Sequence, residues 1–227
     1  MTEPRWGPPD PRAAEEESYR IVRSRIDLTR LPRFSRDVTE RVIQASADFD
    51  YFTDLVCDED ALAAGVEALA AGAPVIADSA MVAAGITGCP LISKIGEPLT
   101  ARLARTAAIS PAAAAVRLAF GEAGPGAVWV VGGGAEALQE LLARRVEAAF
   151  VVGLPAGFVG AAEAKDALRA SGMASVSNVS EKGGPAVAVA AFSALLAAAT
   201  TGGGSKPGRD PAGRPGRAER DWAAGSG

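Results

Sequence analysis

A short apolar run that ends in Gly, Pro or Asp and leads into an alanine-rich helical stretch occurs three times in this chain. The pairs are "APVIAD" with "SAMVAAGI", "AVWVVGGG" with "AEALQELLARR", and "AAFVVGLP" with "GAAEAKDALRA". Strands that are apolar on both faces are typical of a sheet covered by helices on both sides, and strand–turn–helix units in series give parallel strands. The sequence therefore predicts an α/β fold with a mainly parallel sheet flanked by helices.

Two amphipathic helices are predicted before these units, in "PRAAEEESYRIVRSRIDL" and "SRDVTERVIQASADF". Acidic residues near the start of the first favour a helix N-terminus, and Ser35 or Asp37 is a predicted N-cap of the second. Apolar residues recur on one helical face of each, namely Tyr19, Val22 and Ile26, and then Val38, Val42 and Ile43.

Composition indicates one folded domain between two irregular ends. Of the 227 residues, 48% are hydrophobic, which is enough for one sizeable core. Residues 1–11 are rich in proline and are expected to form an irregular lead. Residues 200–227 are rich in Gly, Pro and Arg and are expected to be a disordered tail. The domain is therefore predicted to span residues 12–199.

Charge and cysteine content exclude several classes of protein. The 23 Lys and Arg nearly balance the 27 Asp and Glu, so no nucleic-acid partner is expected. Cys57 and Cys89 form no C-x-x-C pair, so neither a disulfide framework nor a metal cluster is expected. No apolar run approaches the roughly 18 residues that span a bilayer, and the N-terminus lacks a signal-peptide pattern. We expect a soluble, cytoplasmic protein with no membrane partner.

Polar residues and glycines at the predicted strand ends are the first candidate site. Ligands of open α/β sheets bind beyond the carboxyl ends of the strands, where Asp78 and residues 132–134 and 153–157 are expected. For Asp78 and Ser79 two interpretations stay open, a cap on the next helix or a polar contact to a ligand. Gln44, in the middle of a helix, is likewise either an ordinary exposed residue or a site residue.

The segment "VWVVGGGAEALQELL" formally matches G-x-G-x-x-A through Gly132, Gly134 and Ala137. A nucleotide phosphate at such a helix start would meet the negative charge of Glu136. The next strand ends in Gly and Pro, without the acidic residue that a dinucleotide site requires. Glycine for close packing of strand and helix is the favoured interpretation, and a nucleotide-binding enzyme is a remote alternative.

Two further turns carry more glycine than a plain connection needs. "VVGLPAGFVGAAEAK" has Gly153, Gly157 and Gly160 around a strand end, which indicates a surface where a ligand approaches the main chain. "SEKGGPAVAV" places Lys182 before two glycines and a predicted helix that begins at Pro185. A cation beside free N–H groups favours carboxylates on a ligand.

Five motifs of the chain, in order, resemble the precorrin-8X methylmutase family of cobalamin biosynthesis over about residues 15–198. They are "EEESYRIVRS", "ERVIQASADFDY", "GAPVIADSAMVAAGI", "VVGLPAGFVGAAEAK" and "KGG" followed by an alanine-rich helix. The resemblance implies a Rossmann-like homodimer that binds a tetrapyrrole near the subunit interface. It also implies an isomerisation without a cofactor, in which a methyl group migrates from C-11 to C-12 and gives hydrogenobyrinic acid or its cobalt form.

The resemblance also implies the site residues. In the family, a histidine in the helix matching "ERVIQASAD" is thought to donate a proton or a strong hydrogen bond to a ring nitrogen, and here Gln44 has that position. A glutamine amide donates a hydrogen bond but no proton at neutral pH. The alternative source of an acid is a Lys, Cys, Tyr or carboxylic acid with a raised pKa, from this subunit or its partner. The implied substrate-binding residues are Ser18, Asp78, Ser79, Ser110, Gly133, Gly157, Gly160, Lys182, Gly183 and Gly184.

Several positions depart from the family's pattern. Ser110 and Pro111 stand where the family has a hydroxyl and a guanidinium, so the guanidinium is replaced by Pro111. Glu136 and Glu181 add negative charge. The lost cation and the added carboxylates both weaken binding of a polycarboxylate. Three hypotheses follow. The chain is an active methylmutase with Gln44 as a hydrogen-bond donor, or a relative that binds a corrinoid or other tetrapyrrole without turnover as a carrier or pathway partner, or, remotely, a nucleotide-binding enzyme.

Overall fold

Six strands form one sheet in the computed structural model, which describes residues 10–202 of the chain. The strands are β1 (Leu55–Cys57), β2 (Val75–Ala77), β3 (Leu91–Ile92), β4 (Val128–Val131), β5 (Phe150–Gly153) and β6 (Ser175–Asn178). Their order across the sheet is β1-β6-β5-β4-β2-β3, and all neighbours are parallel except β1 and β6. The predicted mainly parallel α/β fold is confirmed.

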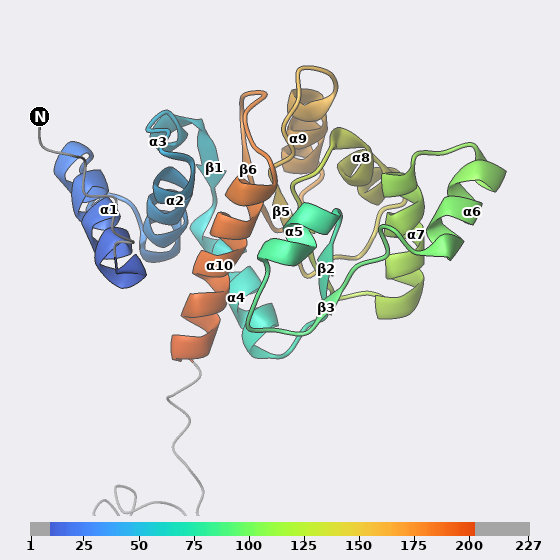
Figure 1. The fold of residues 1–227 in the computed structure, drawn as a ribbon, viewed down its shortest axis with the longest axis horizontal. Helices are drawn as coiled ribbons and strands as arrows, with labels where there is room; N and C mark the ends of the chain where they lie inside the picture. The colour runs from blue at the N-terminus through green and yellow to red at the C-terminus, as the bar shows by residue number, and fades with distance from the viewer. Residues whose placement is uncertain (1–9, 203–227) are drawn as a thin grey trace, which may run out of the picture.

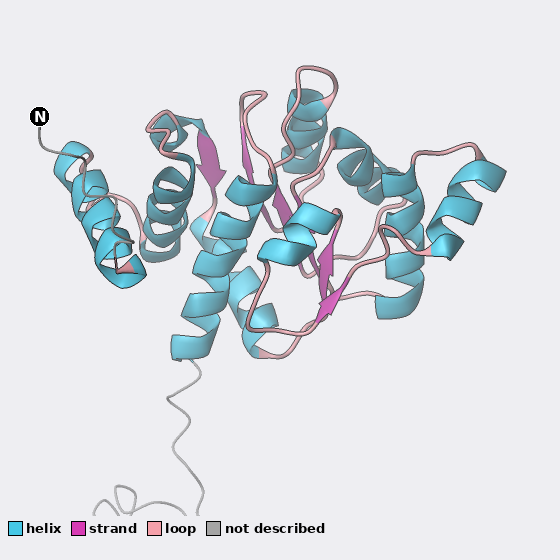
Figure 2. Ribbon diagram, viewed as in Figure 1, coloured by secondary structure: helices cyan, strands magenta, loops and turns pink. Residues whose placement is uncertain are grey.

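Helices cover both faces of the sheet (Figures 1 and 2). One face packs against α2 (Arg33–Ser46), α4 (Glu59–Ala70), α5 (Ala80–Gly85) and α10 (Pro185–Gly202). The other packs against α7 (Pro111–Ala123), α8 (Ala135–Ala143) and α9 (Ala161–Ala170), with α6 (Pro98–Ala107) beside α7. α1 (Pro11–Arg25) lies outside α2, and the short α3 (Tyr51–Asp54) leads into β1.

Successive residues of each central strand enter different cores. Val128 and Val130 of β4 face the α10 side, while Trp129 and Val131 face the α7–α9 side, and all four are buried. This alternation follows from the two-residue period of a strand, and it explains why the strands are apolar throughout.

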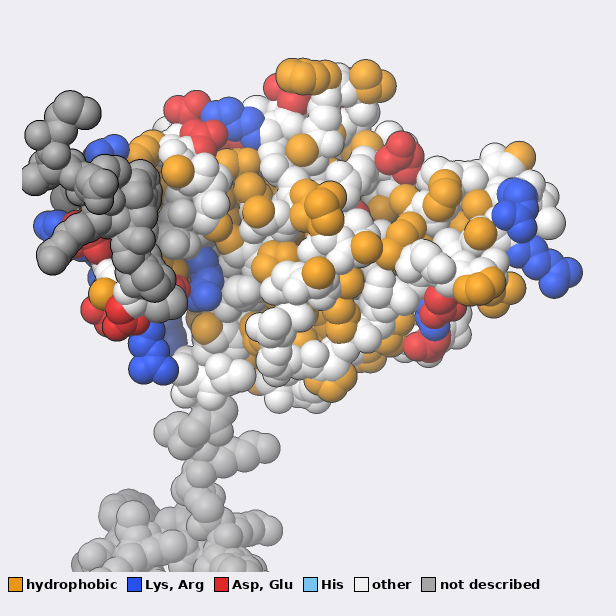
Figure 3. Space-filling view, in the orientation of Figure 1, with side chains coloured by type: hydrophobic (Ala, Val, Ile, Leu, Met, Phe, Trp, Pro, Cys, Tyr) orange, Lys and Arg blue, Asp and Glu red, His pale blue; other side chains and the backbone are white. Residues whose placement is uncertain are grey.

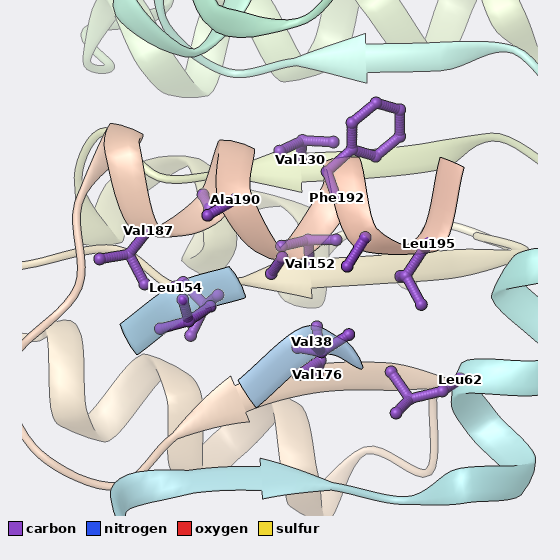
Figure 4. Packing of buried hydrophobic residues seen from close by; sticks show 14 of the residues in the cluster. Val38, Leu62, Val130, Val152, Leu154, Val176, Val187, Ala190, Phe192 and Leu195 are labelled. Carbon is purple, nitrogen blue, oxygen red and sulfur yellow. The ribbon is translucent and has the colours of Figure 1, made fainter. Parts of the chain in front are cut away.

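The helix α10 occupies the centre of one layer. It lies between the sheet and α2, and its side chains Phe192 and Leu195 are buried against strands and helices (Figure 4). Glycine also allows α5 to approach α10 closely, because a Cβ atom on Gly85 of α5 would lie only 2.8 Å from a methyl group of Val189 on α10.

The start of α2 corrects one prediction. The N-cap is Pro32, and Ser35 lies within the first turn while Asp37 lies further along the helix. The carboxylate of Glu59, from α4, accepts hydrogen bonds from Phe34 N at 2.8 Å and Ser35 N at 2.9 Å. An acidic side chain from another helix therefore performs the capping that was predicted for a local residue.

The predicted domain ends also differ slightly from the structure. α1 begins at Pro11, and α10 continues past Ala199 to Gly202. Most of the predicted lead and tail lie outside the described residues. Within residues 10–202 no helix is long and apolar enough to cross a membrane.

Candidate functional site

The carboxyl ends of β2, β4, β5 and β6 meet at one edge of the sheet, because these strands are parallel neighbours or share a neighbour. The helices that follow them begin at the same edge, so their free N–H groups also point there. The β5–α9 and β6–α10 loops lie side by side at the top of Figure 1, where Gly157 N donates to Glu181 O at 3.0 Å.

Asp78 joins the ends of β2 and β4. Its carboxylate accepts hydrogen bonds from Gly132 N at 3.2 Å and Gly133 N at 2.8 Å. Burial raises the pKa of Asp78, and the hydrogen bonds from Gly133 and Gly132 oppose that rise. The capping interpretation is confirmed for Ser79, whose hydroxyl accepts from Val82 N at 3.3 Å as the N-cap of α5.

The structure brings Gly133 against Asp78 and Ser79. A Cβ atom at Gly133 would lie 2.9 Å from Asp78 Oδ2 and 3.1 Å from Ser79 Cβ. Three predicted site residues from two different strand ends therefore form one cluster.

Gly183 and Gly184 bring the β6–α10 loop against the end of β5. Gly184 N donates to Leu154 O at 2.8 Å, and a Cβ atom at Gly183 would lie 2.7 Å from Pro155 O. Gly183 has φ +147°, a conformation that side chains rarely adopt. Only glycine permits this approach of two loops.

A cavity of about 550 Å³ lies between these loops and is lined by Ala156, Gly157, Phe158, Glu181 and Lys182. In the β5–α9 loop, Phe158 is 94% exposed and Val159 is 91% exposed, and Figure 3 shows apolar side chains at the top of the molecule, where this loop lies in Figure 1. A hollow with one apolar wall and one charged wall suits a ligand with an apolar body and acidic substituents.

Lys182 is already engaged within the protein. Its ammonium donates to Asp48 at 2.7 Å and Asp50 at 2.6 Å, both in the turn after α2. Hydrogen bonds to these carboxylates raise the pKa of Lys182 and lower that of Asp48. A ligand carboxylate at Lys182 therefore competes with two resident carboxylates.

Three polar residues for which the sequence suggested no role hold the β6–α10 loop. The Lys165 ammonium, on α9, donates to Asn178 Oδ1 at 2.8 Å and Lys182 O at 2.8 Å, and also to Ser180 O. Asn178 Nδ2 in turn donates to Asp54 at 2.8 Å. Lys165 and Asn178 are fully buried. In the sequence, Lys165 is the last residue of the motif "VVGLPAGFVGAAEAK" and falls on the buried face of its helix, beside Ala161, Ala164 and Leu168, but neither feature gave it a role.

The remaining predicted residues lie on separate elements. Gln44 is half-buried near the end of α2, and Ser18 is half-buried on α1. Ser110 is the N-cap of α7, where its hydroxyl accepts from Ala113 N at 3.1 Å. Gly160 has φ +80° and lies against Gln139 and Ala135 of α8.

Two other regions are less suited to a ligand. A hollow of about 670 Å³ between α1 and α2 is lined mainly by charged residues, and two of these, Arg23 and Glu40, pair with one another. At the start of α8, Glu136 folds back over Gly134, so a carboxylate occupies the position that a phosphate would take. Within the described residues no group of His, Cys, Asp and Glu has the geometry of a metal site.

Fold and site together define an α/β protein whose candidate ligand cavity lies at the carboxyl ends of a mainly parallel sheet. The family model described as Precorrin-8X methylmutase matches residues 13–198. The chain is 36% identical to the cobalt-precorrin-8 methylmutase of Salmonella typhimurium over 82% of this chain and 94% of the relative. It is 35% identical to the precorrin-8X methylmutase of Pseudomonas aeruginosa over 82% and 95%.

A crystal structure of precorrin-8X methylmutase from Thermus thermophilus has the same fold. It superimposes with a TM-score of 0.76 at 34% identity and covers 85% of this chain and 98% of that one. The chain belongs to the precorrin-8X methylmutase family, as its motifs predicted.

Proposed function

We propose that the protein catalyses the migration of a methyl group from C-11 to C-12 of precorrin-8X or its cobalt-containing counterpart. The product is hydrogenobyrinic acid or its cobalt form. The match of the family model over residues 13–198 carries this proposal, because it spans the whole described sheet and both loops of the cavity. The reaction is intramolecular and requires no cofactor, so the protein's contribution is to bind, orient and polarise the ring.

In this proposal the two loops hold the macrocycle over the strand ends. Gly157, Gly160, Gly183 and Gly184 allow the ring to approach the main chain, with Ser18, Asp78, Ser79, Ser110, Gly133 and Lys182 as the polar contacts. The Gln44 amide donates a hydrogen bond to a ring nitrogen, which draws electron density from the neighbouring carbon and favours methyl migration.

A second candidate function is tetrapyrrole binding without turnover. The observation that favours it is the absence of histidine from all 227 residues, together with Gln44 at the family's proton-donor position. General acid catalysis contributes about 10²- to 10⁴-fold to a rate. A protein that lacks this contribution still serves as a carrier that passes a corrinoid to another enzyme.

We further propose a homodimer, which the family resemblance implies, acting in the cytoplasm. In support of the dimer, Met81 of α5, a helix that packs against α10, is 68% exposed, so its side chain is available for an apolar contact. In support of the cytoplasm, Cys57 and Cys89 are free thiols, and free thiols persist in a reducing compartment. Light scattering during gel filtration should give twice the chain mass of 22.9 kDa, and a monomer at micromolar concentration would contradict the dimer.

The experiment that tests the function is to mix the purified protein with precorrin-8X and follow the visible spectrum, beside the Gln44→His variant. Conversion by the unmodified protein supports the isomerase and shows that a hydrogen bond is sufficient. A changed spectrum from binding, with no conversion, supports the carrier. No spectral change with either protein would refute both tetrapyrrole functions.

A further inference from the structure

We propose that Lys165 is a positioning residue for the candidate site: its buried ammonium fixes the backbone of residues 180–182, of which Glu181 and Lys182 line the cavity. This inference rests on the proposed tetrapyrrole function. Lys165 lies on α9 and contacts the cavity through this loop, so it acts on a ligand through the groups that it holds.

The ammonium of Lys165 is fully satisfied by its surroundings. An ammonium has three N–H donors, and the three acceptors Asn178 Oδ1, Ser180 O and Lys182 O receive one hydrogen bond each. Two of these acceptors are carbonyls of the loop itself. A buried cation is costly unless every donor is paired, so this arrangement selects one conformation of the loop.

A carboxylate secures the same loop from the other side. Asp54 accepts hydrogen bonds from Val179 N at 3.1 Å, Ser180 N at 2.7 Å and Ser180 Oγ at 2.7 Å. Asn178 joins the two charges, because its amide oxygen accepts from Lys165 and its amide nitrogen donates to Asp54. The uncharged side chain of Asn178 therefore links the positive charge of Lys165 to the negative charge of Asp54.

The network reaches the ligand side of the loop through Glu181 and Lys182. Both residues line the cavity, and Lys182 also bonds to Asp48 and Asp50 after α2. A shift of the loop would therefore change both the cavity wall and the link between β6 and the end of α2, the helix that carries Gln44.

The decisive variant is Lys165→Met, which keeps the length of the side chain and removes its donors. Leu168→Ala is the matched control, because Leu168 is fully buried on the same helix but packs in the core on the α7–α9 side of the sheet. Both changes destabilise α9, and only the first removes bonds to the loop.

Two measurements on the full chain test the proposal. Hydrogen exchange at the amides of Ser180 and Gly184 should accelerate in Lys165→Met and stay near wild type in Leu168→Ala, at a temperature where both are folded. Spectral titration with hydrogenobyrinic acid should show affinity weakened by roughly tenfold or more in Lys165→Met, the equivalent of about one lost buried hydrogen bond, and nearly unchanged in the control.

The pH dependence of binding is a further readout. Burial lowers the pKa of Lys165 to about 8, with Asp54 and Glu181 opposing that change and Arg169 adding to it. The wild-type affinity should therefore fall as the pH rises through about 8, because a neutral amine keeps only two of its three donors, and Lys165→Met should lack this step.

Unchanged exchange at Ser180 and Gly184 in Lys165→Met would overturn the positioning role, whether or not a ligand binds. Faster exchange with unchanged affinity in Lys165→Met would also overturn the positioning role. An equal loss of affinity in Leu168→Ala would do the same, because either result would show that Lys165 only stabilises the fold. If the wild-type protein binds no tetrapyrrole, the proposed function fails, and the inference about its site fails with it.

Discussion

Gly183 and Gly157 have nearly the same φ angle in very different surroundings. Their φ angles are +147° and +148°. A Cβ atom at Gly157 would have only Ala161 Cβ nearby, at 3.9 Å, whereas one at Gly183 would lie 2.7 Å from Pro155 O and closer still to Leu154 O. Substituting each by alanine therefore separates backbone strain from steric clash.

The expected losses follow from these distances. A non-glycine residue held in such a region of φ costs about 1–3 kcal/mol, and this applies to both variants. Gly183→Ala adds a clash with backbone atoms that cannot rotate away, and overpacking of this kind costs about a further 1–3 kcal/mol. Gly183→Ala should therefore lower the free energy of unfolding by about 1–3 kcal/mol more than Gly157→Ala.

Urea unfolding followed by circular dichroism measures this difference directly, provided that the free energy of unfolding falls with urea concentration at the same slope in both variants. Equal losses in the two variants would refute the reasoning, because they would show that the two loops separate at no cost. The hydrogen bond from Gly184 N to Leu154 O would then contribute little to the site.

Three further results are expected. The Gln44→His variant should convert precorrin-8X about 10²- to 10⁴-fold faster than the unmodified protein. Its rate should fall as the pH rises through about 6.5, the ordinary pKa of histidine. A rate that does not change with pH would contradict the role of the imidazole as an acid. Burial raises the pKa of Asp54, but hydrogen bonds from Asn178 and Ser180 outweigh it and leave the pKa below its ordinary value. The stability that the wild type has over Asp54→Asn should therefore be present at pH 7 and shrink below about pH 4, and a difference constant with pH in chemical denaturation would disprove this. Asp50→Asn should strengthen tetrapyrrole binding several-fold at low salt by releasing Lys182, and weaker binding in a spectral titration would show that the pair with Asp50 orients the lysine instead.

Local patterns predicted the central part of the fold. β2, β4 and β5 are apolar on both faces and end at Asp, Gly or Pro, so each strand and its following helix can be recognised within about 20 residues. The outer strands carry no such pattern. β3 has two residues, β1 has three, and β6 reads "SVSN", so their pairing depends on contacts between distant segments.

The candidate site was predicted in part for the same reason. The turns at strand ends contain glycines whose spacing is visible in the sequence, and the sheet brings them together. The bond from Asn178 to Asp54 joins residues 124 positions apart, and Lys165 lies in a helix where a lysine usually faces solvent. No local pattern identifies a lysine that is buried because loop carbonyls surround it.

The pairing of Lys182 with Asp48 and Asp50 bears on the choice between enzyme and carrier as strongly as the identity of Gln44 does. A methylmutase must hold its polycarboxylate ring in one orientation, and the cation at the cavity is shared by Asp48 and Asp50. A ligand carboxylate that reaches Lys182 must displace at least one of them, so orientation depends on contacts elsewhere, chiefly the main chain at the glycines. If Asp50→Asn improves binding and conversion together, loose orientation limits the reaction, whereas better binding without conversion would leave the missing acid at Gln44 as the limiting factor.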